Sequence, residues 1–362
     1  MLNSITDIPG IRVGSASDLK AITGCTVVLC EKGAVAGVDI RGGAPGTRET
    51  DCLRPMHLVE RVHALALVGG SAFGLEAASG VMQYLEEKGI GLCLGEVSVP
   101  IVPAAVIFDL GIGNCKIRPD KKMGYQACLD ARGGRIEEGS VGAGCGATVG
   151  KLYGLQQGMK GGLATTSINL SKGVIVSALV VVNAFGDIID EKGEILAGAR
   201  DPQTNKTVDK RRGLDKSNKR GLDKSSPYNK SSPYNKSSPY NKSSPYNKSS
   251  PYLFINTTKK MFSEEIIPGP VVTNTTLGVV ATNAKLNKEE INKVAQMAQD
   301  GLARAISPSH TLVDGDTIFA LSYGERSHNL STIGAAAAEA VAQAIRRAVK
   351  ISKSLGGVPS LA

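Results

Sequence analysis

The 362-residue sequence has no tryptophan, only 6 Phe and 9 Tyr, and no long uninterrupted apolar run. A transmembrane helix needs about 18 consecutive apolar residues, so we expect no membrane span. The first ten residues lack a basic flank and an apolar stretch, so we expect no signal peptide. No C-x-x-C pair occurs among the seven cysteines, which favours buried, reduced thiols in a cytoplasmic protein.

The excess of basic side chains is confined to one segment. The chain carries a formal net charge of +9. Residues 205–252 contain nine Lys, three Arg and three Asp, so this segment accounts for the whole excess and the remainder is neutral. A nucleic-acid-binding domain is expected to carry a basic patch on its folded surface. The charge distribution therefore gives no support to a nucleic-acid partner.

Glycine and aliphatic residues are abundant instead. The chain has 43 Gly, and 42% of its residues are hydrophobic. The glycines follow no three-residue period, which excludes collagen, and the hydrophobic content argues against a wholly disordered chain. Short apolar runs alternate with helical periodicities over residues 11–200, so the sequence predicts an α/β (α+β) fold.

Apolar periodicity predicts the main helices and strands. Cys25–Cys30 and Ala34–Ile40 are β-rich and separated by Lys32-Gly33, which predicts a hairpin. Asn287 and Glu290 have the spacing of a capping box, which predicts a helix start. The predicted helices are Ser71–Glu87, with an apolar stripe of Phe73, Ala77, Val81 and Leu85, Asn287–Ile306 and Asn329–Ser352. The other predicted strands are His63–Val68, Val174–Val182, Thr276–Thr282 and Thr317–Ser322.

Residues 205–265 interrupt this pattern. The hexapeptide SSPYNK recurs from Ser225 to Tyr252 with a strict six-residue period. A proline in each repeat removes hydrogen-bond donors and blocks helix formation, so we interpret 205–265 as a disordered, solvated linker. It separates the main part of a folded domain, 1–204, from the rest of that domain, 266–362. The alternative is that the repeats are a Tyr- and Pro-rich ligand for a partner domain.

The residues Thr273-Asn274-Thr275-Thr276 stand at the start of the first strand after the linker and are a candidate nucleophilic site. A threonine hydroxyl is a poor nucleophile unless a base lies beside it. Cleavage of the bond before one of these threonines would supply that base, because the freed α-amine has a pKa of about 7.7–8.0. An ordinary turn is the alternative explanation for Asn-Thr-Thr, and the pattern alone does not decide between the two.

Two carboxylates, Asp314 and Asp316, flank a glycine just before the strand Thr317–Ser322. Paired acids at such a place can orient a nucleophile or an amine, and an Asx turn is the alternative. The nearby His310 and these acids do not have a recognised metal-ligand spacing, so we expect no metal site.

Two further polar residues are candidates for the same chemistry. Asn183 ends the apolar strand Val174–Val182, where its amide could donate to an oxyanion or cap the strand. Lys151 follows the glycine-rich residues 139–150, but Leu152 departs from the Ser/Thr of a phosphate-binding P-loop. A solvated surface charge is the alternative for Lys151.

Seven stretches jointly carry a family resemblance. They are VDIRGGAPGTRETD (38–51), LVGGSAFGLEAASGVM (67–82), VPAAVIFDLG (102–111), GSVGAGCGATVGK (139–151), VVVNAFG (180–186), NTTLGVVATNA (274–284) and HTLVDGDTIFA (310–320). Together they resemble the L-aminopeptidase/D-esterase family of N-terminal-nucleophile hydrolases, which includes β-aminopeptidases and the nylon-oligomer hydrolase. The resemblance covers nearly the whole chain apart from 205–265.

The resemblance implies a four-layer αββα sandwich, as in ornithine acetyltransferase, and autocatalytic cleavage between Asn274 and Thr275. Thr275 would begin the mature small chain and act as the nucleophile, and Lys151 would lie near it. It also implies homo-oligomers of cleaved protomers, tetramers or larger, that act on short peptides or amides without a cofactor or metal.

The resemblance assigns roles to three further residues. Asn183 would bind the oxyanion, and Asp314 and Asp316 would hold Thr275 and its amine. Some family members have Tyr where Phe108 stands here, so any substrate contact of that hydroxyl is absent.

The leading hypothesis is thus a self-cleaving aminopeptidase. Three alternatives stay open. One is an endo-type hydrolase of 6-aminohexanoate (nylon) oligomers. The second is an acyltransferase of the ornithine acetyltransferase type, against which the HTLVDGDT and RGGAPGTRETD stretches argue because they resemble the hydrolases. The third is a non-enzymatic binding module that uses the SSPYNK repeats.

Overall fold

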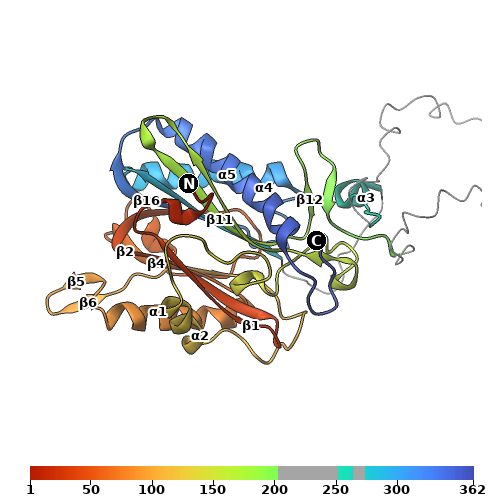
Figure 1. The fold of residues 1–362 in the computed structure, drawn as a ribbon, viewed down its shortest axis with the longest axis horizontal. Coiled ribbons are helices and arrows are strands. Elements are labelled where there is room, and N and C mark those ends of the chain that lie inside the picture. Colours follow the sequence, from red (N-terminus) through yellow and green to blue (C-terminus); the bar gives the residue numbers. More distant parts are fainter. Residues whose placement is uncertain (203–251, 264–273) are drawn as a thin grey trace, which may run out of the picture.

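The computed structural model describes residues 1–202, 252–263 and 274–362 (Figure 1). The SSPYNK repeats before Tyr252, and with them most of the predicted linker, lie outside the described residues. A nine-stranded mixed sheet has the order β10-β11-β14-β16-β2-β4-β7-β3, and β1 pairs with β2 at its side. In chain order these strands are β1 (Arg12–Asp18), β2 (Thr23–Ile40), β3 (Thr47–Arg48), β4 (Arg61–Val68), β7 (Ala104–Val106), β10 (Gly162–Asn169), β11 (Ile175–Asn183), β14 (Thr275–Ala284) and β16 (Thr317–Arg326). The main helices are α1 (Ala77–Glu86), α2 (Lys121–Leu129), α4 (Lys288–Ala305) and α5 (Leu330–Ile351).

Strand β2 is a single 18-residue strand, so the hairpin predicted at Lys32-Gly33 is wrong. It pairs with β4 up to Leu29 and again at Ala34 and Val35, with a register shift between Leu29 and Ala34. Its C-terminal part, from Val35 to Ile40, pairs with β16. Gly33 has φ +81° within this irregularity, a conformation that glycine adopts without strain. An irregularity of this kind bends a strand, and β2 thereby passes from one half of the sheet to the other.

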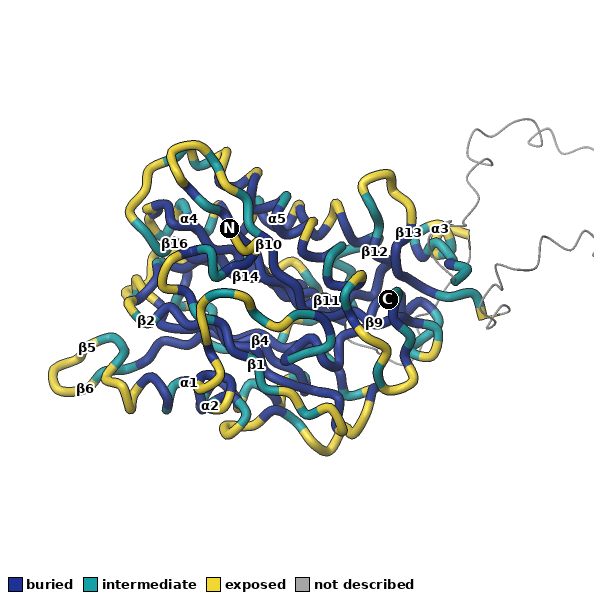
Figure 2. Tube along the Cα trace, in the orientation of Figure 1, coloured by how far each residue is buried: buried dark blue, intermediate teal, exposed yellow. Residues whose placement is uncertain are grey.

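Alternate residues along the strands face three different cores, which defines four layers. Val180 of β11 packs in the core with α4 and α5, whereas its neighbour Val181 packs between the two halves of the sheet. Leu65 of β4 belongs to the same middle core, and Ala66 belongs to a third core with α1 and α2. The layers are therefore helix, sheet, sheet and helix, as the resemblance implies (Figure 1). Figure 2 shows the central strands buried and the outer loops exposed.

The helix predicted over Ser71–Glu87 begins as a 3₁₀ helix, η3 (Ser71–Glu76), and becomes α-helical only at Ala77. A 3₁₀ turn contains three residues rather than 3.6, so the predicted apolar stripe is not continuous through it. Phe73 is accordingly 58% exposed, and the Arg118 guanidinium lies 3.8 Å from the centre of its ring.

The start of α4 follows the prediction. The Asn287 side chain accepts from the Glu290 backbone N–H, and the Glu290 carboxylate accepts from the Asn287 N–H, both at 2.9 Å. These reciprocal bonds confirm the capping box.

The seven cysteines are free thiols. Cys25, Cys30, Cys128 and Cys145 are buried, as expected, but Cys93 and Cys115 are exposed and Cys52 is half-buried. The prediction of buried thiols is therefore correct for only four of the seven cysteines.

The predicted linker boundary at residue 265 is too far along the chain. Residues 252–263 belong to the folded part: Phe254 is 2% exposed, and Thr257 begins α3 (Thr257–Ser263). The buried Asp187 carboxylate accepts from the Thr257 N–H at 2.8 Å and from its hydroxyl at 2.9 Å. These contacts attach α3 to β12 (Asp187–Ile189). Among the helices of the described ranges, none is long and apolar enough to cross a membrane.

Candidate active site

The strand register brings the sequence-predicted site residues to one edge of the sheet. Thr275 opens β14 directly opposite Asn183, the last residue of β11. β14 and β16 run parallel, so the residues that precede them also meet, and Asn274 forms a bridge with Asp314. Asn183, Asn274 and Asp314 are buried, and Thr275 is only 3% exposed.

The carbonyl group of Asn274 is held by two donors. The Gly315 N–H donates to its oxygen at 2.6 Å, and the Thr275 hydroxyl donates to the same oxygen at 2.5 Å. The Asn274 N–H donates in turn to the Val313 carbonyl at 2.7 Å. A Cβ at Gly315 would lie 2.7 Å from the Thr275 hydroxyl oxygen and 2.6 Å from the Ala44 carbonyl oxygen. Only glycine therefore allows this close approach.

Lys151 is a buried group rather than the solvated surface charge that was its alternative, with 4% of the residue exposed. Its ammonium donates to the Asn183 side-chain oxygen at 2.8 Å and to the Asn183 backbone carbonyl at 3.1 Å. Burial lowers the pKa of Lys151 to about 7, the Asp314 carboxylate acts to raise this pKa, and the cation of Lys160 acts to lower it. Lys151 is thus able to lose or accept a proton near neutral pH.

Both ends of the Asn183 amide are engaged. Its oxygen also accepts from the Thr148 N–H at 3.0 Å, and its nitrogen donates to the Phe108 carbonyl at 3.1 Å. The sequence suggested this amide as the oxyanion donor. In the structure the backbone N–H of Gly315 and the Thr275 hydroxyl are instead the donors to the Asn274 carbonyl.

Asp314 is oriented by neighbouring backbone groups. Its Oδ1 accepts from the Phe185 N–H at 3.1 Å, and its Oδ2 accepts from the N–H of Thr311 at 3.1 Å and from the Thr311 hydroxyl. Burial, together with the neighbouring Asp316 carboxylate, raises the pKa of Asp314 to about 6.

Asp316 holds the start of β14. Its Oδ1 accepts at 2.7 Å from the N–H of Thr276, which is the residue after the candidate nucleophile. Its Oδ2 accepts from the His310 N–H at 3.0 Å and lies 2.9 Å from Nδ1 of the His310 ring. Asp316 therefore contacts the residue next to Thr275 and is itself oriented by His310.

The RGGAPG stretch is the backbone support of the two acids. The Ala44 N–H donates to the Asp314 carbonyl at 2.8 Å, and the Arg41 N–H donates to the Asp316 carbonyl at 3.0 Å. A Cβ at Gly42 would lie 2.3 Å from the Asp314 carbonyl oxygen. The motif thus has small residues where the two backbones touch.

Sequence reasoning missed two buried charged residues near this site, Lys160 and Asp109. The Lys160 ammonium donates to the Cys145 carbonyl at 2.6 Å, and the Asp109 carboxylate accepts from the Gly70 N–H at 2.7 Å. Each stands alone in an apolar or glycine-rich run, in GMKGGLA and in AVIFDLG. That placement is a usable signal, since an isolated charge in such a run is unfavourable unless it is paired or functional.

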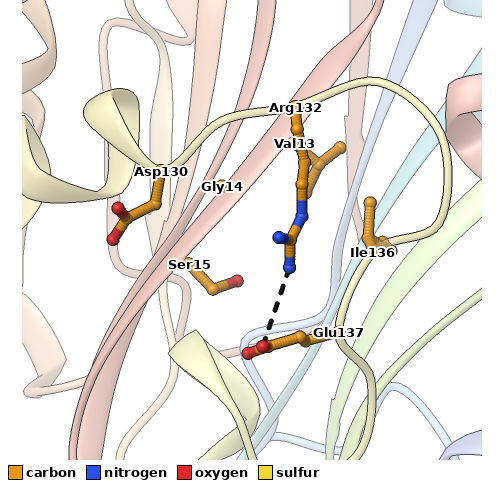
Figure 3. Close-up of a pocket in the computed structure, with 7 residues that line it drawn as sticks. All are labelled: Val13, Gly14, Ser15, Asp130, Arg132, Ile136 and Glu137. Atoms are coloured by element: carbon orange, nitrogen blue, oxygen red, sulfur yellow. Dashed lines mark ion pairs between the residues drawn. The ribbon is translucent and has the colours of Figure 1, made fainter.

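The structure also has an open pocket of about 350 Å³, which is lined by residues other than those around Thr275 (Figure 3). Val13, Ser15 and Asp130 line it, and the Arg132 side chain points toward Glu137, with 3.6 Å between the charged groups. None of the sequence-predicted site residues is among those that line it. The candidate active site is therefore defined by the buried cluster around Thr275 and not by this pocket.

The fold is shared with solved structures of one class of hydrolase. A β-aminopeptidase of a Burkholderia species matches with a TM-score of 0.65 and 18% identity, covering 100% of this chain and 91% of that one. The L-aminopeptidase D-Ala-esterase/amidase of Ochrobactrum anthropi matches with a TM-score of 0.65 and 16% identity, covering 99% and 88%. The latter is described as a variant of the Ntn-hydrolase fold. The fold of this chain is therefore of the Ntn-hydrolase type.

Sequence relatives identify the family. The family model described as peptidase family S58 matches residues 3–360. An uncharacterized aminopeptidase of Mycobacterium leprae is 38% identical over 99% of this chain and 93% of its own length. A 6-aminohexanoate-oligomer endohydrolase of a Kocuria species is 29% identical over 95% of this chain and 85% of its own length. The chain belongs to peptidase family S58 and is a hydrolase, as the resemblance predicts.

Proposed function

We propose that this hydrolase is an aminopeptidase that cuts its own chain between Asn274 and Thr275 and then uses Thr275 as an N-terminal nucleophile. The observation that carries the proposal is the contact of the Thr275 hydroxyl with the Asn274 carbonyl, whose oxygen the Gly315 N–H also binds at 2.6 Å. A hydroxyl next to a polarised carbonyl has the parts that an acyl shift needs.

The self-cleavage step follows from this geometry. The Thr275 oxygen bonds to the Asn274 carbonyl carbon, the C–N bond between the two residues breaks, and the Thr275 nitrogen takes the hydroxyl proton. Water then hydrolyses the resulting ester, which leaves a carboxylate on Asn274 and a free amine and hydroxyl on Thr275. The Gly315 N–H stabilises the oxyanion of both steps, an effect worth about 2.7–4 kcal/mol for one well-placed donor.

In the mature enzyme the freed amine of Thr275 acts as the base for its own hydroxyl. Attack on a substrate amide gives an acyl-enzyme, and water releases the acid. The cation of Lys151, which lies against Asn183 opposite Thr275, disfavours protonation of the amine. Asp314 and Asp316 hold the loop and the strand start on which Thr275 sits. In this structure the Asn183 amide nitrogen donates to the Phe108 carbonyl. To stabilise the oxyanion, it must give up this hydrogen bond and donate to the substrate instead.

The substrate side of the proposal rests on an apolar cluster beside the site. Leu152, Phe185 and Ala199 are its buried members, and the half-buried Tyr153, Ile255 and Val313 pack against them. Leu152 follows Lys151 and Val313 precedes Asp314, so the cluster adjoins the reacting groups. An apolar side chain of a short peptide or amide would contact it.

A second candidate substrate is favoured by one comparison. The Kocuria relative is a 6-aminohexanoate-oligomer endohydrolase, and the apolar cluster also suits an unbranched methylene chain. Comparing kcat/KM for an amino-acid anilide and for a 6-aminohexanoate oligomer, with purified enzyme, decides between the two. The proposal includes a cytoplasmic location. It also includes a homo-oligomer of cleaved protomers, and light scattering of the purified protein would test that oligomeric state.

The deciding experiment is an intact mass under denaturing conditions together with N-terminal sequencing. We expect two chains, 1–274 and 275–362, and a small chain that reads TTLGVV. A single chain of 37.6 kDa that persists for days at neutral pH while the preparation is fully active would contradict the proposal.

A further inference from the structure

Lys160 is a fully buried lysine that the proposed mechanism does not use. It is 0% exposed and among the largest side chains buried to this extent. Its ammonium donates to the Cys145 carbonyl at 2.6 Å, and its backbone N–H donates to the Pro359 carbonyl at 2.8 Å. An ammonium group in a protein interior is unfavourable unless other groups compensate it, so its presence here calls for an explanation.

The position of Lys160 relates it to the active site. β8 (Thr148–Val149) and β9 (Met159–Lys160) form a two-stranded ribbon in which Lys160 is opposite Thr148. Thr148 donates to the Asn183 side-chain oxygen, and Lys151, which binds the same oxygen, lies two residues beyond β8. The bond from Lys160 to Cys145 therefore ties β9 to the segment that leads into β8.

Asp109 supports the other end of the Asn183 amide. It follows Phe108, whose carbonyl accepts from the Asn183 nitrogen at 3.1 Å. The Asp109 carboxylate is fixed by the Gly70 N–H and by the Thr23 hydroxyl, both at 2.7 Å.

Asp109 and Lys160 meet at the same piece of backbone. A Cβ at Gly146 would lie 2.4 Å from Cβ of Asp109, so Asp109 packs directly on the residue after Cys145. The acceptor of Lys160 and the packing surface of Asp109 are thus consecutive residues.

We infer that Lys160 and Asp109 are positioning residues of the active site, which together hold the segments that anchor Asn183 and Lys151. This inference rests on the proposed function, because it assigns the two residues a role in that reaction. Neither residue contacts the reacting atoms, and both act through the Asn183–Lys151 contact.

Their charges make the inference testable. The charged groups that act on Lys151 are Asp314, Lys160 and Asp109, with Asp316 beside Asp314 and, after cleavage, the Thr275 amine. The Lys160 cation lowers the pKa of Lys151, and the Asp109 carboxylate raises it. The proposed mechanism uses the Lys151 cation, so loss of its proton sets the basic limb of the pH profile. Removal of the two charges must therefore shift this basic limb in opposite directions.

The experiment measures kcat, KM and the pH dependence of kcat/KM for purified, cleaved Lys160→Met and Asp109→Asn enzymes. The matched control is Lys116→Met, an exposed lysine. We expect kcat to fall about 10- to 100-fold in both variants with little change in KM, as for a misplaced catalytic group. The basic limb should move up by about half a pH unit or more in Lys160→Met and down in Asp109→Asn. The control should match the wild type.

Each single variant leaves one buried charge without its opposite, so a third variant is included. Lys160→Met/Asp109→Asn removes both charges, and its basic limb should return toward that of the wild type while kcat stays low. Shifts in the same direction, or no shift, would overturn the inference. So would a set in which none of the three variants folds, because the pair would then serve the fold alone. Thr275→Ala separates the two proposals. If Thr275→Ala is inactive and the pH profiles of the Lys160 and Asp109 variants do not shift, only this inference is contradicted. If Thr275→Ala is active, the proposed function is contradicted.

Discussion

The backbone N–H of Gly315 binds the carbonyl oxygen of Asn274 at 2.6 Å, across two segments that are adjacent only because β14 and β16 run parallel. The same oxygen accepts from the Thr275 hydroxyl. A hydrogen bond to this carbonyl draws charge from its carbon, and the adjacent hydroxyl lies on Thr275, at the bond where we propose cleavage. The relationship between Gly315 and Asn274 is thus the geometric basis of the proposed self-cleavage.

The first prediction concerns the nucleophile. Thr275→Ala should leave the chain uncut and inactive, because alanine has no attacking oxygen. Thr275→Ser should be cut and keep part of the turnover, because serine retains both the oxygen and the amine. Denaturing gels over time and an amidase assay measure both effects. Normal maturation of Thr275→Ala would show that another residue does the cutting.

The second prediction concerns Gly315. A methyl group there would lie 2.7 Å from the Thr275 oxygen, so Gly315→Ala should slow self-cleavage about 100-fold by displacing the reacting groups. Gly133→Ala is the matched control, because no atom lies within 4 Å of a Cβ at that position. Mass spectrometry of freshly expressed protein follows the cut fraction, and circular dichroism verifies the fold. Equal cleavage rates in the two variants would exclude a role for the close approach at Gly315.

The third prediction concerns the paired acids. Asp314→Asn and Asp316→Asn each replace one carboxylate oxygen by a donor that faces backbone N–H groups. We expect kcat to fall about 100-fold and the free energy of unfolding to fall by about 1–3 kcal/mol. Asp51→Asn, on an exposed surface pair with Arg54, is the control and should change neither quantity. Wild-type kcat in both site variants would reduce these acids to turn residues.

The fourth prediction concerns the repeat-bearing segment. The Asp201 N–H donates to the Leu253 carbonyl at 3.1 Å, so the chain on either side of the segment is already adjacent. A short connection can therefore replace the segment at little entropic cost, and deletion of 206–248 should leave cleavage and turnover within about two-fold of wild type.

A longer deletion serves as the contrast. Removing 206–256 also removes Phe254, which is buried, and we expect a loss of about 3–5 kcal/mol in the free energy of unfolding. Urea unfolding measures the free energy of unfolding of both deletion variants, and the amidase assay measures their turnover. Loss of activity in the shorter deletion would favour the binding-module alternative for the repeats.

Several features of this protein were predictable from the sequence because they depend on local patterns. The almost wholly apolar run over Val174–Val182 predicts a strand buried on both faces, and its alternate residues indeed belong to two different cores. The capping box of Asn287 and Glu290 needs only four consecutive residues and is confirmed. Seven motifs together made the family and its hydrolase chemistry recognisable. The match of the peptidase family S58 model to this chain confirms the family.

Local patterns failed where a distant segment determined the outcome. Lys32-Gly33 has the composition of a turn, but β4 and β16 pair with the two ends of β2 and keep it a single strand. Phe73 fits a helical stripe, but the 3₁₀ geometry before Ala77 leaves it exposed. For β2 the tertiary pairing outweighed the local preference, and for Phe73 the helix type differed from the one that the spacing predicts.

The sequence by itself determined which chemical groups are present and which strands carry them. Only the tertiary structure decided their contacts: that Gly315 binds the Asn274 carbonyl, that Lys151 is buried against Asn183, and that Lys160 and Asp109 lie behind them. The physical reason is that these partners are far apart in the chain and meet through strand register. Burial then decides the charge of a lysine, because the protein interior disfavours its protonated form.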